Sequence, residues 1–324
     1  MWVADTGATQ LVADSLSEEL AQSALAEENA AIVRSEEVVA LAKSWPTYRG
    51  RQIGTDDIRA WYQQVPSARD QRTLFELLKK TKIFSEAQVR ERLRTAHGFV
   101  RASLPVPITR KRNERRTDIV ITYIDGEGKS GANYASLYAE ENNILARCVL
   151  APDSFIKQLD RHIKENGAIS SVIIMDDIAA TGTPIGDNAT KFINENISYL
   201  ANVKIKIICL VSTPSAQEQI IRKLEKIPDV EVDFRACEIL DKSCIAFPDD
   251  KSGWSSAEEW ERGRALCVQL GSRVYKKSPL GYGNMGLLVV FPTTTPNNSL
   301  PILHSYSRAG SEAPWSPLFL RVVH

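Results

Sequence analysis

The stretch that most constrains this chain runs from residue 172 to residue 184 and has the sequence VIIMDDIAATGTP. Its four leading apolar residues, three of them β-branched, predict a strand at residues 172–175 that is buried on both faces, as in parallel sheets covered by helices. Asp176 and Asp177 follow, and Thr183 before Pro184 predicts a helix N-cap with proline at the first helical position. We therefore expect two carboxylates at a solvent-facing sheet edge, beside a helix N-terminus that attracts phosphate.

This pattern resembles the PRPP-binding motif of the type I phosphoribosyltransferases, which has an apolar strand, two acids, a few small residues, Thr-Gly, a variable residue and Thr. The resemblance implies that Asp176 and Asp177 are the catalytic acids and hold the ribose hydroxyls. It also implies that Thr181, Gly182 and Thr183 bind the 5′-phosphate. Mg²⁺ is the implied cofactor, bound with PRPP and not by direct protein ligation.

Two positions depart from the family pattern. Pro184 replaces the usual last Thr and has neither a hydroxyl nor an N–H, so one phosphate contact depends on the Thr183 hydroxyl. Ala180 lies where purine-salvage members carry an acid that acts on the base, so we expect no such acid–base chemistry. The alternative without a ligand is a solvated acid pair and a capped turn at the end of an ordinary α/β strand.

The glycine-rich loop at residues 125–131, DGEGKSG, has two interpretations. As G-x-G-x-x-G between a strand and a helix, with Asp153 as the ribose-binding acid, it predicts a dinucleotide-binding protein. As the first-strand loop of a phosphoribosyltransferase it binds pyrophosphate, with Lys129 as the cation. We favour the second interpretation because a dinucleotide fold is not expected to carry an acid pair and Thr-Gly on a later strand. The pyrophosphate loop then comprises Gly126, Gly128, Lys129, Ser130 and Gly131.

Strand and helix patterns alternate from residue 118, which is the signature of a parallel sheet. Strands are predicted at residues 118–124, 144–150, 172–175, 203–211 and 230–236. The predicted fold class is α/β, with a doubly wound, mainly parallel five-stranded sheet of the phosphoribosyltransferase-like type. An N-terminal helical domain and a C-terminal hood complete it.

Domain boundaries follow from breaks in these patterns. Residues 1–104 have helical spacing and form the predicted N-terminal module. Two prolines and a basic cluster mark residues 105–117 as a linker. Residues 118–324 are the predicted phosphoribosyltransferase-like domain, and the alternation stops at about residue 238, where we expect the hood that selects the acceptor in this family.

Charge and cysteine content limit the classes of protein to consider. The 324 residues include 40 basic and 40 acidic side chains, so no global field recruits nucleic acid or an anionic membrane. The five cysteines form no C-x-x-C pair and are odd in number, which argues against a disulfide framework and a zinc site. No apolar run approaches about 18 residues, and no signal peptide is recognisable. We expect a cytoplasmic protein that binds neither a membrane nor, directly, nucleic acid.

The chain as a whole resembles phosphoribosyltransferase-like proteins of prokaryotic conflict systems, some of which are encoded beside retron reverse transcriptases. The features that carry this resemblance are the helical front, Gly-Lys-Ser-Gly, the acid pair and the Thr-Pro-Asn-Asn tail. This resemblance implies an effector in anti-phage defence, with a protein partner, such as a reverse transcriptase complex, bound through residues 1–104.

Two functions remain open at this point. The first is binding of Mg-PRPP or a related ribose phosphate, with displacement of pyrophosphate at the anomeric carbon. The second is a non-catalytic subunit that binds a nucleotide or a partner, which Pro184 and Ala180 favour.

Overall fold

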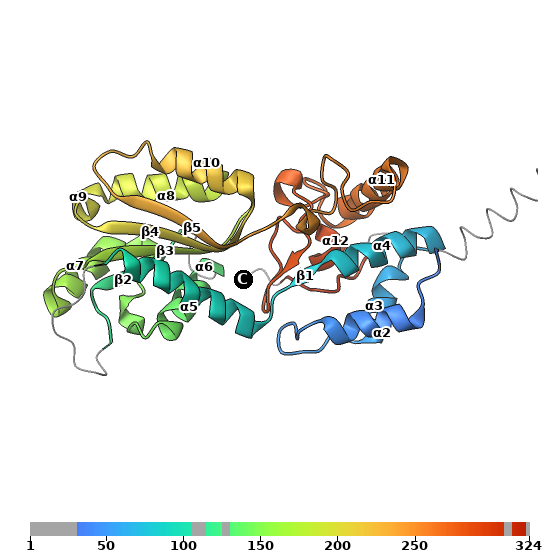
Figure 1. The fold of residues 1–324 in the computed structure, drawn as a ribbon, viewed down its shortest axis with the longest axis horizontal. Coiled ribbons are helices and arrows are strands. Elements are labelled where there is room, and N and C mark those ends of the chain that lie inside the picture. Colours follow the sequence, from blue (N-terminus) through green and yellow to red (C-terminus); the bar gives the residue numbers. More distant parts are fainter. Residues whose placement is uncertain (1–30, 105–114, 125–129, 308–312, 322–324) are drawn as a thin grey trace, which may run out of the picture.

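The structure, a computed structural model, describes residues 31–104, 115–124, 130–307 and 313–321. Within these ranges the chain forms two lobes that lie side by side (Figure 1). The sheet lobe holds the larger sheet, and the second lobe is built from residues 31–83 and 245–321, which come from opposite ends of the chain. No helix within the described ranges is long and apolar enough to span a membrane.

The larger sheet has four parallel strands in the order β2-β3-β4-β5. These are β2 (Ile119–Tyr123), β3 (Ser171–Ala179), β4 (Lys204–Ser212) and β5 (Val232–Ile239). One face is covered by α5 (Glu86–Ala102) and α6 (Ser130–Glu141), and the other by α7 (Phe155–Asn166), α8 (Thr183–Glu195) and α10 (Pro214–Leu224) (Figure 1). The short α9 (Ile197–Leu200) leads into β4. The predicted α/β class with a parallel sheet is confirmed.

The fifth predicted strand, at residues 144–150, does not form. Residues Ala146–Cys148 make a 3₁₀ turn, and only single parallel bridges, Arg116 to Ile144 and Ile121 to Val149, flank it. The Leu150 N–H also donates to the Ile121 carbonyl at 2.8 Å. Because the turn takes up the residues between the two bridges, a continuous ladder cannot form.

This edge segment still fixes the topology of the sheet. The chain leaves β2, passes through α6 to the edge segment beside β2, and then returns through α7 to β3 on the other side of β2. The winding direction therefore reverses between β2 and β3. In open α/β sheets, ligands bind beyond the carboxyl ends of the strands at such a switch point.

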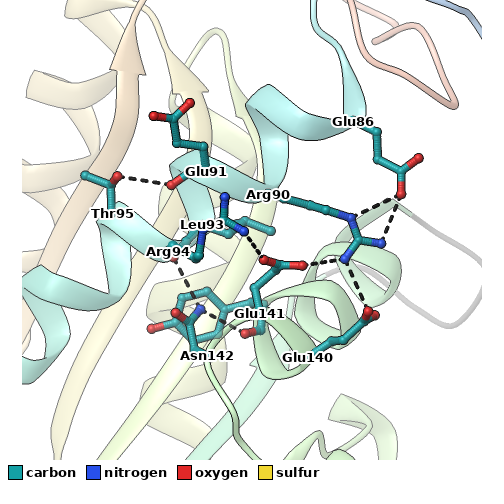
Figure 2. A network of polar contacts seen from close by, with 10 residues as sticks. Glu86, Arg90, Glu91, Leu93, Arg94, Thr95, Glu140, Glu141 and Asn142 are labelled. Carbon is teal, nitrogen blue, oxygen red and sulfur yellow. Dashed lines mark hydrogen bonds and ion pairs between the residues drawn. The ribbon is translucent and has the colours of Figure 1, made fainter.

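Helix α5 belongs to the core of the sheet lobe, although it precedes the predicted boundary at residue 104. Val89, Leu93 and Val100 are buried in one apolar cluster with β2, β3 and α6. Figure 2 shows the polar contacts between α5 and α6, in which Arg90 and Arg94 both pair with Glu141. The side chains of Glu141 and Arg90 are 11% and 28% exposed, whereas Arg94 is 54% exposed, so only the contact with Arg90 is shielded from most of the solvent.

The second lobe joins the remaining N-terminal helices to the C-terminal part of the chain. It contains α2 (Ser35–Ser44), α3 (Thr55–Tyr62), α4 (Ala68–Lys80), α11 (Ala257–Val274) and α12 (Pro301–His304). Trp61 of α3 and Trp315 both donate their indole N–H to the Ile302 carbonyl, at 3.1 and 2.8 Å. The helical front and the predicted hood therefore share one core. The division at residue 104 stays a prediction, because residues 105–114 of the predicted linker lie outside the described ranges.

A small parallel sheet joins the two lobes. It pairs β1 (Lys82–Ile83) with β6 (Val289–Val290). Successive side chains of a strand point to opposite faces, so Leu288 and Val290 enter the core of the second lobe, whereas Val289 and Phe291 enter the core beside α5 and α6. This alternation fixes how the second lobe sits over the carboxyl edge of the larger sheet.

Candidate functional site

A cavity of about 620 Å³ lies at the carboxyl ends of β2 and β3, at the switch point of the sheet. Its walls come from both lobes. The sheet lobe contributes the start of α6, the end of β3, the turn that follows and the start of α8. The second lobe contributes Arg49, Tyr282, residues 293–298 and Arg321.

Asp176 and Asp177 line this cavity from within β3, which continues through Ala179 instead of ending before the acids. Each residue is only 8% exposed, so the expected solvent-facing position is wrong. The reason is that the second lobe covers this edge of the sheet. The Asp177 N–H donates to Asp176 Oδ1 at 2.8 Å.

Burial raises the pKa of the Asp177 carboxyl, while the side chains of Ser130 and Asp176 and the charge of Arg321 act in the opposite direction. The charged form of Asp177 is therefore disfavoured until a ligand or cation compensates for the loss of water. A strongly perturbed acid in a cavity is a candidate for function.

The turn after β3 has the shape that its glycine requires. Gly182 has φ = +76°, and a Cβ there would lie 2.7 Å from the Ala216 carbonyl oxygen. Gly182, and not Thr183, is the N-cap of α8, so the predicted cap is wrong by one residue. The left-handed glycine turns the chain into the helix early, which leaves Thr183 and Pro184 as its first two residues.

The predicted phosphate contacts are brought together only in part. Thr181 and Gly182 line the cavity, whereas Thr183 does not. The Thr183 hydroxyl accepts a hydrogen bond from Gln219 Nε2 at 2.8 Å. It therefore does not replace the hydroxyl that Pro184 lacks.

The predicted pyrophosphate loop is described only at its end. Ser130 lines the cavity as the first residue of α6. A Cβ on Gly131 would lie 3.2 Å from the Met175 carbonyl oxygen and from Tyr123 Cβ, so this glycine lets α6 approach the sheet closely. Gly126, Gly128 and Lys129 lie outside the described residues. Asp153, the ribose acid of the dinucleotide interpretation, is exposed and does not line the cavity.

Tyr134 is a cavity residue that sequence reasoning missed. Its hydroxyl is buried and makes no hydrogen bond of normal geometry with the described residues. Burial and the charge of Asp177 raise the pKa of this phenol, against an opposing effect of Thr293. Tyr134 follows Ser130 by four residues, and this helical spacing places the two on one face of α6. That spacing is the signal that could have identified it.

The second lobe supplies the parts of the site that no motif marked. Tyr282 is 43% exposed at the cavity, and Asn297 is an exposed side chain of the 293–298 segment. A Cβ on Gly283 would lie 2.8 Å from Thr181 Cγ2, so the turn around Gly283 rests directly on the Thr-Gly turn. The cavity thus has a polar and aromatic wall opposite its acids.

Comparison with known families adds one finding. A family model described as PRTase-CE, a phosphoribosyltransferase-like family, matches residues 58–321. The match spans both lobes and every sequence-predicted residue of the site. No curated protein matches the chain.

Proposed function

We propose that the chain, which belongs to the PRTase-CE family of phosphoribosyltransferase-like proteins, binds Mg-PRPP or a related ribose phosphate in the cavity between its lobes. The observation that carries this proposal is the meeting of Asp176 and Asp177 with Thr181 and Gly182 in one cavity at the switch point of the sheet. Carboxylates suit hydroxyl donors, and a left-handed glycine turn before a helix suits a phosphate.

Each part of the cavity has a role in this proposal. The two acids accept hydrogen bonds from the ribose hydroxyls, and Thr181 with the backbone around Gly182 holds the 5′-phosphate. The buried Tyr134 hydroxyl, which lacks a partner among the described residues, donates to the ligand. Such a donor would otherwise lose the hydrogen bond that it makes in water.

The residues present fit a Mg²⁺ ion that arrives with its ligand. Mg²⁺ prefers one or two carboxylates together with phosphate oxygens and water. The described residues contain no cluster of three or more metal-ligating side chains, so phosphate oxygens of the ligand and water would coordinate the ion, and the charges of Asp176 and Asp177 would favour a cation beside them without ligating it directly. When bound, the ion neutralises charge on the diphosphate.

The proposed reaction is displacement of pyrophosphate at the anomeric carbon, and the protein contributes mainly orientation and charge stabilisation. A non-catalytic binding subunit is the second candidate, and one observation favours it. Because Gln219 engages the Thr183 hydroxyl and Pro184 offers no donor, the phosphate turn has one contact fewer than the family pattern. A role in anti-phage defence, with a reverse transcriptase complex as partner, is proposed on sequence resemblance alone.

The test is thermal unfolding with Mg-PRPP and with NAD. A ligand that binds only the native state adds about 2.7 kcal/mol at a hundredfold excess over Kd. We expect stabilisation by Mg-PRPP, none by NAD, and none by Mg-PRPP in Asp176→Asn. Stabilisation by NAD alone would favour the dinucleotide interpretation. Release of pyrophosphate from PRPP, with and without candidate acceptors, then separates the enzyme from the binding subunit.

A further inference from the structure

Two arginines from opposite ends of the chain contribute to the wall of the cavity that the second lobe provides. Arg49 and Arg321 both line the cavity. Their chain neighbours are joined directly, because the Tyr48 hydroxyl donates to the Leu320 carbonyl at 2.7 Å. The Tyr48 ring also packs edge-on against Phe319, with ring centroids 5.4 Å apart.

The backbone of each arginine is held in place as well. The Arg49 N–H donates to the Pro292 carbonyl at 2.7 Å, immediately before the 293–298 segment of the cavity wall. The Arg321 N–H donates to the His304 carbonyl at 3.0 Å. The two side chains therefore start from a fixed frame, as expected of a binding site built on rigid elements.

The conformation of Arg49 points to a function for its side chain. Arg49 and Gly50 form the turn between Tyr48 and Arg51, with φ = +53° at Arg49 and +75° at Gly50. Glycine and asparagine adopt the left-handed conformation with less strain than arginine does. Strained residues of this kind cluster at ligand sites.

Neither guanidinium is neutralised within the described part of the chain. No ion pair or side-chain hydrogen bond there engages Arg49 or Arg321. Both are close enough to the Tyr48 hydroxyl to oppose the rise in its pKa that burial causes. Arg321 has the same opposing effect on the pKa of Asp177, so its charge acts on that acid.

We propose that Arg49 and Arg321 together bind a second anionic group of the ligand, so that the preferred ligand is a ribose phosphate that carries a separate diphosphate and bridges the two lobes. This inference rests on the proposed function and refines its ligand. We place the 5′-phosphate at Thr181 and Gly182 and the ribose at the acids, so that the diphosphate extends from the side of Ser130 toward Arg49 and Arg321 on the second lobe. The planar fork of arginine suits phosphate oxygens, and two forks suit a diphosphate.

The test measures binding of three probes by calorimetry in the presence of Mg²⁺: PRPP, ribose 5-phosphate and inorganic pyrophosphate. The variants are Arg49→Asn, which tolerates the left-handed conformation, and Arg321→Gln. Arg51→Ala is the matched control, because Arg51 belongs to the same turn, pairs with Asp57 and does not line the cavity. The melting temperature of each variant confirms that it folds.

We expect both cavity variants to weaken binding of PRPP and pyrophosphate at least about tenfold, the loss typical of a hydrogen-bonded charge. Binding of ribose 5-phosphate should change by less than about twofold, and the control should match the wild type with all three probes. Equal weakening of PRPP and ribose 5-phosphate, or unchanged PRPP binding, would overturn the inference.

The same measurements separate the two proposals. Arginine-dependent binding of pyrophosphate, without binding of either ribose phosphate, would refute the proposed function and support the anion site. Binding of ribose 5-phosphate and PRPP that depends on Asp176 and not on the arginines would support the function and refute the anion site. A protein that binds none of the three probes would refute both.

Discussion

Replacing Asp177 by asparagine should stabilise the free protein and abolish its response to ligand. Asp177 is 8% exposed, and burial raises the pKa of its carboxyl, so the ionised form at neutral pH costs free energy. Asparagine keeps the shape and removes the charge. If the acid is there for a ligand and not for the fold, stability and binding should change in opposite directions.

The linkage between pKa and stability gives the direction of this gain, because a raised pKa penalises the ionised carboxyl in the folded state. Single stabilising substitutions commonly add about 0.5–2 kcal/mol, so we expect a gain on the order of 1 kcal/mol at neutral pH. An unfolding entropy of about 2.1 cal/mol/K per residue, taken over 324 residues, converts this to a rise in Tm of about 1.5 °C.

The pH dependence provides the control. A raised pKa means that the wild type is not penalised below the unfolded value of 3.8, where Asp177 is protonated in both states. The penalty grows as pH rises from there through the raised pKa and is constant above it. The advantage of Asp177→Asn in Tm should therefore vanish in acid and reach its full size near neutral pH.

The assay is thermal unfolding of both proteins across this pH range, with and without Mg-PRPP. The wild type should gain several degrees with ligand, and the variant none. Asp176→Asn is the matched comparison at the neighbouring position. A variant that is less stable than the wild type at neutral pH would refute the reasoning, because the carboxylate would then hold the fold together.

Three further outcomes follow from particular contacts. Gly182→Ala should lower the free energy of unfolding by about 2–4 kcal/mol in denaturant titration and remove ligand binding, because its Cβ meets the Ala216 carbonyl and its φ is left-handed. Unchanged stability would show that the turn can move. Tyr134→Phe should change the free energy of unfolding by less than about 0.5 kcal/mol relative to the wild type, since the hydroxyl has no partner among the described residues. It should nevertheless weaken PRPP binding in calorimetry. A large loss of stability would indicate that the hydroxyl makes a structural hydrogen bond. Although burial raises the pKa of Asp118, hydrogen bonds from Arg116 and Ser170 lower it to about 2. Asp118→Asn should therefore lose about 1–2 kcal/mol above the unfolded pKa, and wild-type stability from this group should disappear as pH falls from 3.8 through about 2. Identical acid titrations of the wild type and the variant would contradict this.

The sheet could be predicted from sequence because its signal is local. The apolar run at residues 172–175 forms the buried core of β3, since a strand covered on both faces needs apolar side chains at every position. The prediction of a strand at residues 144–150 was wrong because a buried apolar residue can belong to either a strand or a turn. Ile144, Cys148 and Leu150 are buried around a 3₁₀ turn, and burial alone does not separate a turn from a strand.

The acid pair and the Thr-Gly turn could also be predicted from the sequence, because their residues lie close together in it, and the cavity includes all four. The burial of the acids could not be predicted in this way. The expectation of a solvent-facing edge considered the sheet alone, whereas residues 293–298 and two arginines of the second lobe cover that edge. The burial of this edge depends on tertiary contacts between the two lobes, and the sequence pattern of a single helix or strand does not predict such contacts.

The arginine pair illustrates this limit and also links the fold to the site. Tyr48 and Leu320, whose hydrogen bond holds the pair together, are 272 positions apart, so no local motif could have joined them. The family match begins at residue 58, which places Arg49 outside it and Arg321 at its last residue. The acids and the Thr-Gly turn lie well inside the match. In the proposed assignment, the residues that hold the ribose and the 5′-phosphate thus lie well inside the family match, whereas Arg49, which would hold the second phosphate group, lies outside it. That division of roles is why a ligand series that differs only in the second phosphate group is the most discriminating set of probes for this protein.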